Sequence, residues 1–277
     1  MNFRITPAVK NLLLINFGVY VLAVFIYYQY QVNINDYLGL HSFFSKSFQV
    51  YQFVTYMFMH EFVRDGQLVF GHVFFNMLAL FFLGPILESR WGSKRFIFFY
   101  LFTGLGAGLS YWAVNAYEVY QLREAVSYYL EHPSPGEFAK LVTGFNRGLY
   151  RYWLESEQIL EIFDEYPQNI EAIAWSKTKA MEIYEASTWF SMVGASGCVY
   201  GVLMGAGLIF PNTEVMLLFI PIPVKIKYIA IGLGVMELYH QVKDAPNDQV
   251  AHFAHLAGMA FAYILIRYWN RRRDVFY

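Results

Sequence analysis

Charged residues and cysteine are scarce in this chain, and neither charge sign is in large excess. Asp, Glu, Lys and Arg make up 15% of its 277 residues, against about 25% in ordinary soluble domains. The formal net charge of −1 gives no basis for nucleic acid as a partner, because proteins that bind it carry basic surfaces. With Cys198 as its one cysteine, the chain cannot form an intrachain disulfide.

The chain is instead rich in apolar side chains. Hydrophobic residues account for 57% and aromatic residues for 20%, and the mean hydropathy is +0.34, a composition typical of polytopic membrane proteins. A bilayer core of about 30 Å needs about 20 residues of helix. Six segments approach that length: 11–30, 69–87, 96–116, 188–210, 225–242 and 248–269. The sequence therefore predicts an all-α membrane protein, a bundle of six transmembrane helices that contacts membrane lipids.

The distribution of lysine and arginine predicts the orientation of this bundle. An even number of spans places both termini on one side, and most of the basic residues in the short loops lie on that side. Basic loops remain cytoplasmic, so both termini are predicted to be cytoplasmic. Arg4 and Lys10 precede the first span, which is followed by no small-residue cleavage site, so we expect an uncleaved span. A bacterial plasma membrane is compatible with this arrangement.

The loop between the third and fourth spans differs from the rest of the chain because it is long, polar and acidic. His-Pro-Ser-Pro-Gly at 132–136 and Tyr-Pro-Gln-Asn at 166–169 divide it into three predicted amphipathic helices. We therefore expect spans one to three in 1–116, a helical extramembrane insertion on the outer side in 117–187, and spans four to six in 188–277. The insertion is either a solvated addition or a lid or docking module for substrates.

Three residues of unusual chemistry recur at one depth in the predicted bundle. Spans two, four and six all run inwards, and His72, Ser196 and His255 each fall in the outer half of one of them. Ionisable groups inside a membrane are costly and indicate function. Serine needs an adjacent base to become a nucleophile, and His255 can serve as that base.

Further features near Ser196 support a hydrolytic site. Asn76 lies four residues after His72, so both side chains lie on one helical face and can donate hydrogen bonds to an oxyanion. Gly194 allows a chain break, so that the fourth helix starts at Ser196 rather than at residue 188, leaving free amides there. Pro211 limits that helix, and Pro221 to Pro223 indicate entry into the fifth helix.

Small residues predict close packing of the fourth and sixth spans. Gly197, Gly201 and Gly205 recur every four residues, as do Ala254, Gly258 and Ala262. Such faces allow transmembrane helices to approach closely, which would bring Ser196 to His255.

Other residues could contribute to the site. His252 competes with His255 as base, but it lies about 60° around the helix. Glu237 and Asp248 are candidates for a third catalytic member, yet neither has a spacing that demands it. We therefore expect a Ser196–His255 dyad.

These motifs together resemble the rhomboid family of intramembrane serine proteases. The matching stretches are Gly71 to Asn76, Gly194 to Tyr200 and Ala254 to Gly258, with Glu88 to Gly92 resembling the family's Glu-x-Arg-x-Gly. The resemblance implies Ser196 as nucleophile, His255 as base, and His72, Asn76 and the Ser196 amide as oxyanion donors.

The resemblance also implies Tyr200 packed against His255 and structural roles for Glu88 and Arg90. It implies single-pass transmembrane proteins as substrates, and neither a metal nor an organic cofactor. Ala257 stands where the family often has glycine, and the long third loop exceeds the family core. Two rival functions remain: an inactive rhomboid-like protein that binds transmembrane clients, and a small transporter lined by His72, Asn76 and His255.

Overall fold

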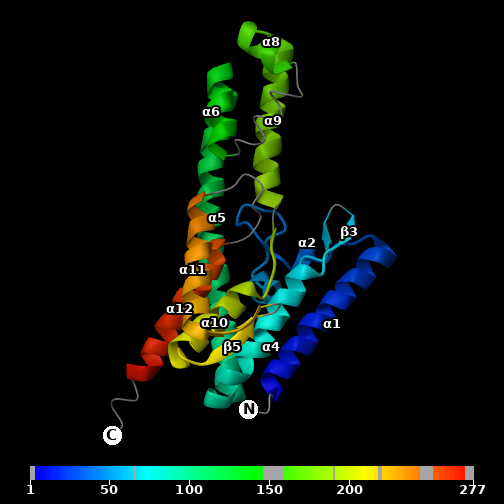
Figure 1. Cartoon of the computed structure of the whole chain (residues 1–277). Coiled ribbons are helices and arrows are strands. Elements are labelled where there is room, and N and C mark those ends of the chain that lie inside the picture. Colours follow the sequence, from blue (N-terminus) through cyan, green and yellow to red (C-terminus); the bar gives the residue numbers. More distant parts are fainter. Residues whose placement is uncertain are drawn as a thin grey trace.

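The computed structural model describes residues 4–64, 66–145, 159–189, 191–217, 220–243 and 252–271. Six helices coincide with the six apolar segments. They are α1 (Pro7–Tyr30), α4 (Gly71–Trp91), α5 (Ser93–Glu131), α10 (Ser196–Ile209), α11 (Ile226–Lys243) and α12 (His252–Arg271). In Figure 1, α1 begins and α12 ends at the same end of this bundle. Among the described residues, α1, α4 and α5 are long and apolar enough to cross a membrane, and α10 is a shorter apolar helix. The count of six spans stays a prediction.

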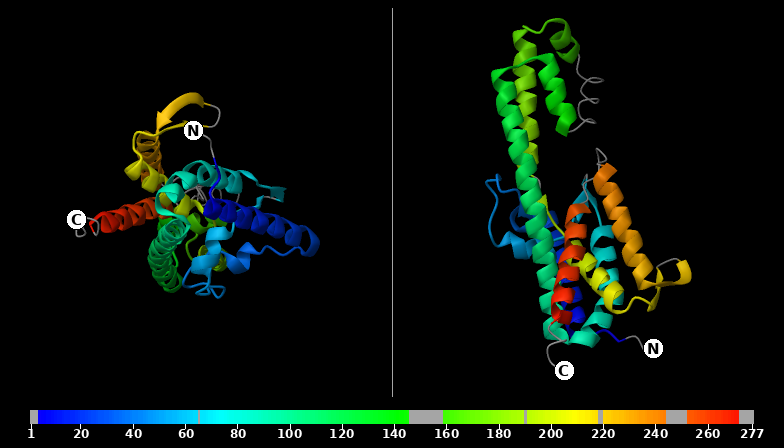
Figure 2. Two further views of the ribbon diagram at one scale, coloured as in Figure 1. Left: turned by 90° about the horizontal axis from the view of Figure 1, so that it is seen from below. Right: turned by 90° about the vertical axis from the view of Figure 1, so that its left-hand side faces the viewer.

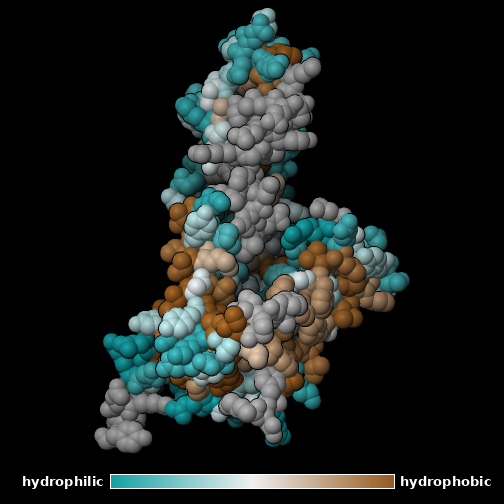
Figure 3. Space-filling view, in the orientation of Figure 1, coloured by the Kyte–Doolittle hydropathy of each residue, from teal (hydrophilic) through white to brown (hydrophobic). Residues whose placement is uncertain are grey.

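The outer surface of the bundle is apolar. On α1, the side chains of Leu14, Val21 and Phe25 are largely exposed. On α11, those of Ile231 and Val235 are also exposed. Figure 3 shows hydrophobic residues along the bundle and mostly hydrophilic residues at the far end of the insertion. Contiguous exposed apolar surface of this extent is what lipid contact requires.

Helix α10 is the central helix and it begins at Ser196. Gly194 has a φ of 131°, a conformation that glycine adopts without the steric cost of a side chain. The predicted span 188–210 is therefore too long, because residue 188 belongs to the preceding helix α9 (Ile170–Trp189). Helix α10 contacts α4, α5, α11 and α12.

The segment predicted to be an insertion, 117–187, contributes to a second hydrophobic core. Helix α5 continues without a break through the boundary expected at 116/117 and reaches Glu131 (Figure 2). It packs there against α6 (Pro135–Phe145) and α9, and α8 (Ile159–Glu165) packs against α6 and α9. Tyr129, Phe138 and Phe163 are buried in this second core. Both proline-containing segments separate helices, as the sequence predicted.

Short elements join the first loop to the bundle. The loop contains α2 (Asn35–Leu38), β1 (Leu40–His41), α3 (Gln52–Thr55), the 3-10 helix η1 (Tyr56–Phe58), β2 (Val63–Arg64) and β3 (Gln67–Leu68). Strand β1 pairs antiparallel with β4 (Ser191–Met192), just before α10. The Gly194 amide donates to the carbonyl of Tyr56 at 3.0 Å. The loop thus fixes the chain that enters α10.

The segment before α11 is a hairpin. Strands β5 (Glu214–Leu217) and β6 (Ile220–Lys225) pair antiparallel, with Met216 opposite Pro223. Proline lacks an N–H group and is confined to edge strands or bulges in sheets, and this ladder contains a register irregularity next to Met216. Pro221 to Pro223 do lie just before the fifth helix, which begins at Ile226, but they lead into it as part of strand β6.

Glu88 joins α4 to the start of α1. Its carboxylate accepts hydrogen bonds from the amides of Ala8 and Val9, at 2.8 and 2.9 Å, and from the Ser93 hydroxyl at 2.6 Å. The Thr6 hydroxyl is a further donor. Amides at a helix start have no intrahelical acceptor, so a carboxylate there stabilises α1. Glu88 therefore has a structural position.

Candidate active site

Ser196 and His255 meet at the N-terminal end of α10. Ser196 is the first residue of α10, and its Oγ lies 2.8 Å from Nε2 of His255 on α12. The Tyr200 ring, one turn along α10, stacks on the His255 ring with centroids 4.3 Å apart and planes inclined by 6°. The stacking keeps the His255 ring parallel to the Tyr200 ring, with Nε2 directed at the Ser196 hydroxyl. This geometry suits proton transfer from Ser196 to His255.

Glycine at two positions permits this meeting. A Cβ atom on Gly258 would lie 2.2 Å from the carbonyl oxygen of Gly197, so α12 and α10 touch backbone to backbone. The predicted glycine stripe is only partly right. A Cβ atom on Gly197, Gly201 or Gly205 would first meet α5, at Ala107, Thr103 or Phe99 respectively, so all three glycines allow the approach of α5.

His72 and Asn76 lie beside the serine. Both line the cavity that contains Ser196. A Cβ atom on Gly194 would lie 2.8 Å from Nε2 of His72. The His72 ring therefore closely adjoins the chain just before the nucleophile. Asn76 is 7% exposed, one turn further into the bundle.

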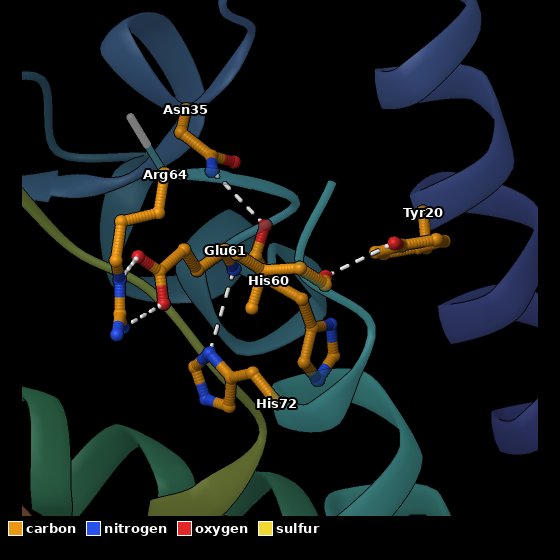
Figure 4. Close-up of polar contacts among 7 residues, drawn as sticks. Tyr20, Asn35, His60, Glu61, Arg64 and His72 are labelled. Atoms are coloured by element: carbon orange, nitrogen blue, oxygen red, sulfur yellow. Dashed lines mark hydrogen bonds and ion pairs between the residues drawn. The ribbon is translucent and has the colours of Figure 1, made fainter. Parts of the chain in front are cut away.

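A backbone contact orients the His72 ring. The Glu61 amide donates to Nδ1 of His72 at 3.4 Å, and the Glu61 carboxylate forms a bidentate pair with Arg64. Figure 4 shows these contacts, with His72 below the loop that carries Glu61. Because Nδ1 accepts, the proton of a neutral ring is on Nε2. His72 thus presents a donor towards Gly194 and the cavity.

His60, in the first loop, is a buried neighbour of His72. Its ring centroid lies 5.2 Å from that of His72, and its carbonyl accepts from the Asn35 side chain at 3.0 Å (Figure 4). Burial, together with the nearby His72 ring, lowers the pKa of His60 to about 3. A neutral His60 places no positive charge next to the site.

Glu237 contacts the histidine that faces Ser196. Its Oε2 lies 3.0 Å from Nδ1 of His255 and also contacts Nδ1 of His252, while its Oε1 accepts from the Tyr200 hydroxyl. Sequence spacing named Glu237 as a candidate third member without requiring it, and the structure places its carboxylate next to His255. Asp248 lies outside the described residues.

His252 occupies the outer side of this cluster. Its Nδ1 contacts Glu237, and its ring centroid lies 6.3 Å from that of His255. Nδ1 of each histidine and a carboxylate oxygen of Glu237 lie within 4.8 Å of one another, so these three side chains could hold a divalent cation. The contacts between them also account for their positions without an ion.

A large cavity opens onto the serine. Its volume is about 1190 Å³, and its polar end contains His72, Asn76, Ser196 and His255. The apolar part of the wall comes mainly from α4 and α10, with two residues from α11, and includes Phe75, Leu78, Phe82, Val199, Leu203, Ile229 and Leu233. Polar side chains of the first loop, among them Asn35, Glu61 and Arg64, line a further part of the cavity. An extended peptide with apolar side chains fits these surroundings, and the polar end can admit water.

Comparison with known proteins identifies the family. The family model of the rhomboid domain matches residues 47–126 and 171–272, more than half of the chain. The chain belongs to the rhomboid family. Rhomboids are integral membrane proteins, and the family comprises intramembrane proteases and inactive homologues. Comparison with curated proteins and with solved structures gave no match.

The matched ranges of the rhomboid domain cover every residue of the candidate site. His72 and Asn76 fall in the first range, and Ser196, Glu237 and His255 fall in the second. The unmatched stretch 127–170 lies within the predicted insertion. The matched rhomboid domain thus contains all of these residues. Helices α6 and α8, which lie in the unmatched stretch, are distant from α10 and α12 (Figure 1).

Proposed function

We propose that this rhomboid is an intramembrane serine endopeptidase that cleaves membrane proteins in or near their transmembrane segments. The observation that carries the proposal is the 2.8 Å contact between Ser196 Oγ and His255 Nε2, at the polar end of an otherwise apolar cavity. A serine hydroxyl becomes nucleophilic when an adjacent base can accept its proton. Both groups needed for this step are present and in contact, which favours an active enzyme over an inactive client-binding homologue.

In the reaction, Ser196 Oγ attacks the carbonyl carbon of the scissile peptide bond, and His255 Nε2 accepts the hydroxyl proton. The negative charge that develops on the carbonyl oxygen accepts hydrogen bonds from His72, Asn76 and the Ser196 amide. His255 then donates its proton to the leaving amine as the C–N bond breaks. Water hydrolyses the acyl-enzyme by the same steps, with His255 again acting as base, and regenerates the serine.

The substrate class follows from the cavity wall. Because α4, α10 and α11 contribute apolar side chains to the cavity that contains the serine, the preferred ligand is an unwound part of a single-pass transmembrane segment. Its backbone must be extended at the scissile bond, since a helical peptide buries its carbonyls in internal hydrogen bonds. Surrounding lipids contact the exposed faces of α1 and α11.

We place the protein in a plasma membrane of bacterial type with both termini in the cytoplasm. This placement rests on the basic short loops on the side of the termini. The insertion, at the opposite end of the bundle from the start of α1 (Figure 1), then lies on the outer side. Cysteine labelling of a Cys198→Ser variant carrying one new cysteine in the insertion checks this, since an impermeant reagent must reach it from outside.

Proteolysis in reconstituted vesicles tests the function. A single-pass model substrate should be cleaved by the wild type and not by Ser196→Ala or His255→Ala. Ser176→Ala, which removes a buried hydroxyl in the insertion core, is the matched serine control and should retain activity. A fluorophosphonate should label the wild type at Ser196, as mapped by mass spectrometry. Cleavage that survives Ser196→Ala would refute the assignment.

A further inference from the structure

A carboxylate is buried in α11, a helix that carries neither the proposed nucleophile nor the proposed base. Glu237 is 4% exposed. It follows Ile229 and Leu233 at intervals of four residues, so the three lie on one helical face, and the first two line the cavity. An ionised side chain in a membrane-embedded helix is strongly unfavourable unless it is paired. The partners of Glu237 therefore indicate its purpose.

Among the residues that the structure describes, the side chains that contact the Glu237 carboxylate are aromatic and belong to the site. The Tyr200 hydroxyl donates to Oε1, and Tyr200 is the ring stacked on His255. Oε2 contacts Nδ1 of His252 and lies 3.0 Å from Nδ1 of His255. This last contact does not have hydrogen-bond geometry, so Glu237 acts on His255 here through charge and through Tyr200.

The carboxylate also bears on which nitrogen of His255 holds the proton. An ionised carboxylate only accepts hydrogen bonds, so it favours a proton on the facing Nδ1. The opposite nitrogen, Nε2, is then free to accept the proton of Ser196, 2.8 Å away. When His255 becomes charged during the reaction, the same carboxylate stabilises the cation.

We propose that Glu237 is a positioning residue for His255. It selects the tautomer with Nδ1–H, and through Tyr200 it holds the ring in the orientation that faces Ser196. The proposal rests on the proposed protease function. Glu237 touches neither the substrate nor the reacting atoms, and its effect passes through His255. It also connects α11, which forms part of the cavity wall, to α10 and α12.

Glu237→Gln tests the tautomer selection most directly. The Gln amide keeps an acceptor for Tyr200 but places an NH₂ group opposite Nδ1 of His255. Nδ1 then becomes the acceptor, and the proton moves to Nε2, which can no longer receive the serine proton. Because general-base catalysis contributes about 10²–10⁴-fold, kcat should fall by at least about 10²-fold while KM changes little. Glu237→Asp should recover part of kcat.

Nitrogen NMR of the imidazoles gives a readout that does not depend on proteolysis. In Ser196→Ala protein with ¹⁵N-labelled histidine at about pH 8, where a histidine with an ordinary pKa is neutral, the His255 resonances should report the Nδ1–H tautomer. Adding Glu237→Gln should change them to the Nε2–H pattern. A His255→Ala spectrum supplies the assignment. Glu88→Gln, a buried carboxylate outside the site, is the matched control and should leave the pattern unchanged.

Three results would overturn the proposal. The first is a Glu237→Gln enzyme whose kcat stays within about 2-fold of wild type. The second is an unchanged His255 tautomer in that variant while the wild type cleaves normally, which would leave the proposed function standing. The third is loss of wild-type activity with a chelator and recovery with Zn²⁺, because Glu237, His252 and His255 would then serve as metal ligands.

Discussion

Gly258→Ala should separate the proposed nucleophile from its base without altering either side chain. The added Cβ would lie 2.2 Å from the carbonyl oxygen of Gly197, whereas a carbon and a carbonyl oxygen approach to about 3.3–3.6 Å. Neither atom belongs to a flexible side chain, so the two helices themselves must move apart. The necessary opening is roughly 1.1–1.4 Å, the difference between 2.2 Å and that normal range.

The clash between residue 258 and Gly197 would disturb the site because both residues lie close in sequence to Ser196 or His255. Ser196 precedes Gly197, and His255 lies one helical turn before Gly258. An opening of about 1 Å lengthens the Ser196–His255 contact from 2.8 Å to well over the 3.0 Å limit of an ordinary O–H hydrogen bond. Misplacement by 1 Å can cost about 10²-fold in rate. Overpacking of this kind costs about 1–3 kcal/mol of stability.

The assay pairs initial cleavage rates in vesicles with thermal unfolding. Gly232→Ala is the matched control, since a Cβ on Gly232 in α11 meets nothing within 4 Å. We expect kcat/KM of Gly258→Ala to fall by about 10²-fold with a lower Tm, and Gly232→Ala to keep its activity. Full activity in a folded Gly258→Ala protein would refute the reasoning that backbone contact sets the distance between the two side chains.

Four further changes have defined outcomes. Gly194→Ala strains a φ of 131° and places a methyl group 2.8 Å from Nε2 of His72, so kcat should fall about 10-fold or more in the same cleavage assay. Asn76→Ala removes a proposed oxyanion donor and should lower kcat by about 10²–10³-fold at an unchanged Tm; an unaltered kcat would exclude it from the reaction. Glu88→Gln should destabilise the fold by about 1–3 kcal/mol, measured by reversible unfolding in detergent, without a change in kcat for the folded fraction. Burial beside His72 lowers the pKa of His60 to about 3, so between about pH 6.5 and 3 the unfolded chain binds a proton that the folded chain does not; stability should decrease as the pH falls through this range, and His60→Gln should make the decrease of Tm shallower.

Sequence patterns located the helices and the reacting residues because those depend on local chemistry. Gly194 correctly predicted the start of α10 at Ser196. Its positive φ is unfavourable for residues with a side chain and interrupts the helical conformation just before Ser196. The boundary at 116/117 had no such signal. Residues 117–131 change in polarity but contain neither Gly nor Pro, so α5 simply continues. A change in polarity indicates a change of solvent and not the end of a helix.

Contacts between helices were beyond local patterns. The repeat of Gly197, Gly201 and Gly205 correctly indicated close packing, and a spacing of four keeps the three residues on one helical face. A Cβ atom on each would first meet α5, at Ala107, Thr103 and Phe99 respectively, whereas α12 is contacted by the carbonyl group of Gly197. Which neighbour covers a stripe depends on the arrangement of the whole bundle.

Glu237 shows how the same physical rule could have gone further. An ionisable side chain in an apolar helix is costly and therefore indicates function, and this rule selects His72 and His255. It applies with equal force to Glu237, which lies in the fifth apolar segment. Its spacing from His255 along the chain carries no information, because the two residues belong to different helices. Burial of a carboxylate requires partners, and the histidines of the next helix are the partners that the structure supplies. A buried carboxylate of this kind is explained by the groups that compensate its negative charge, and for Glu237 one of these groups is the proposed base, His255.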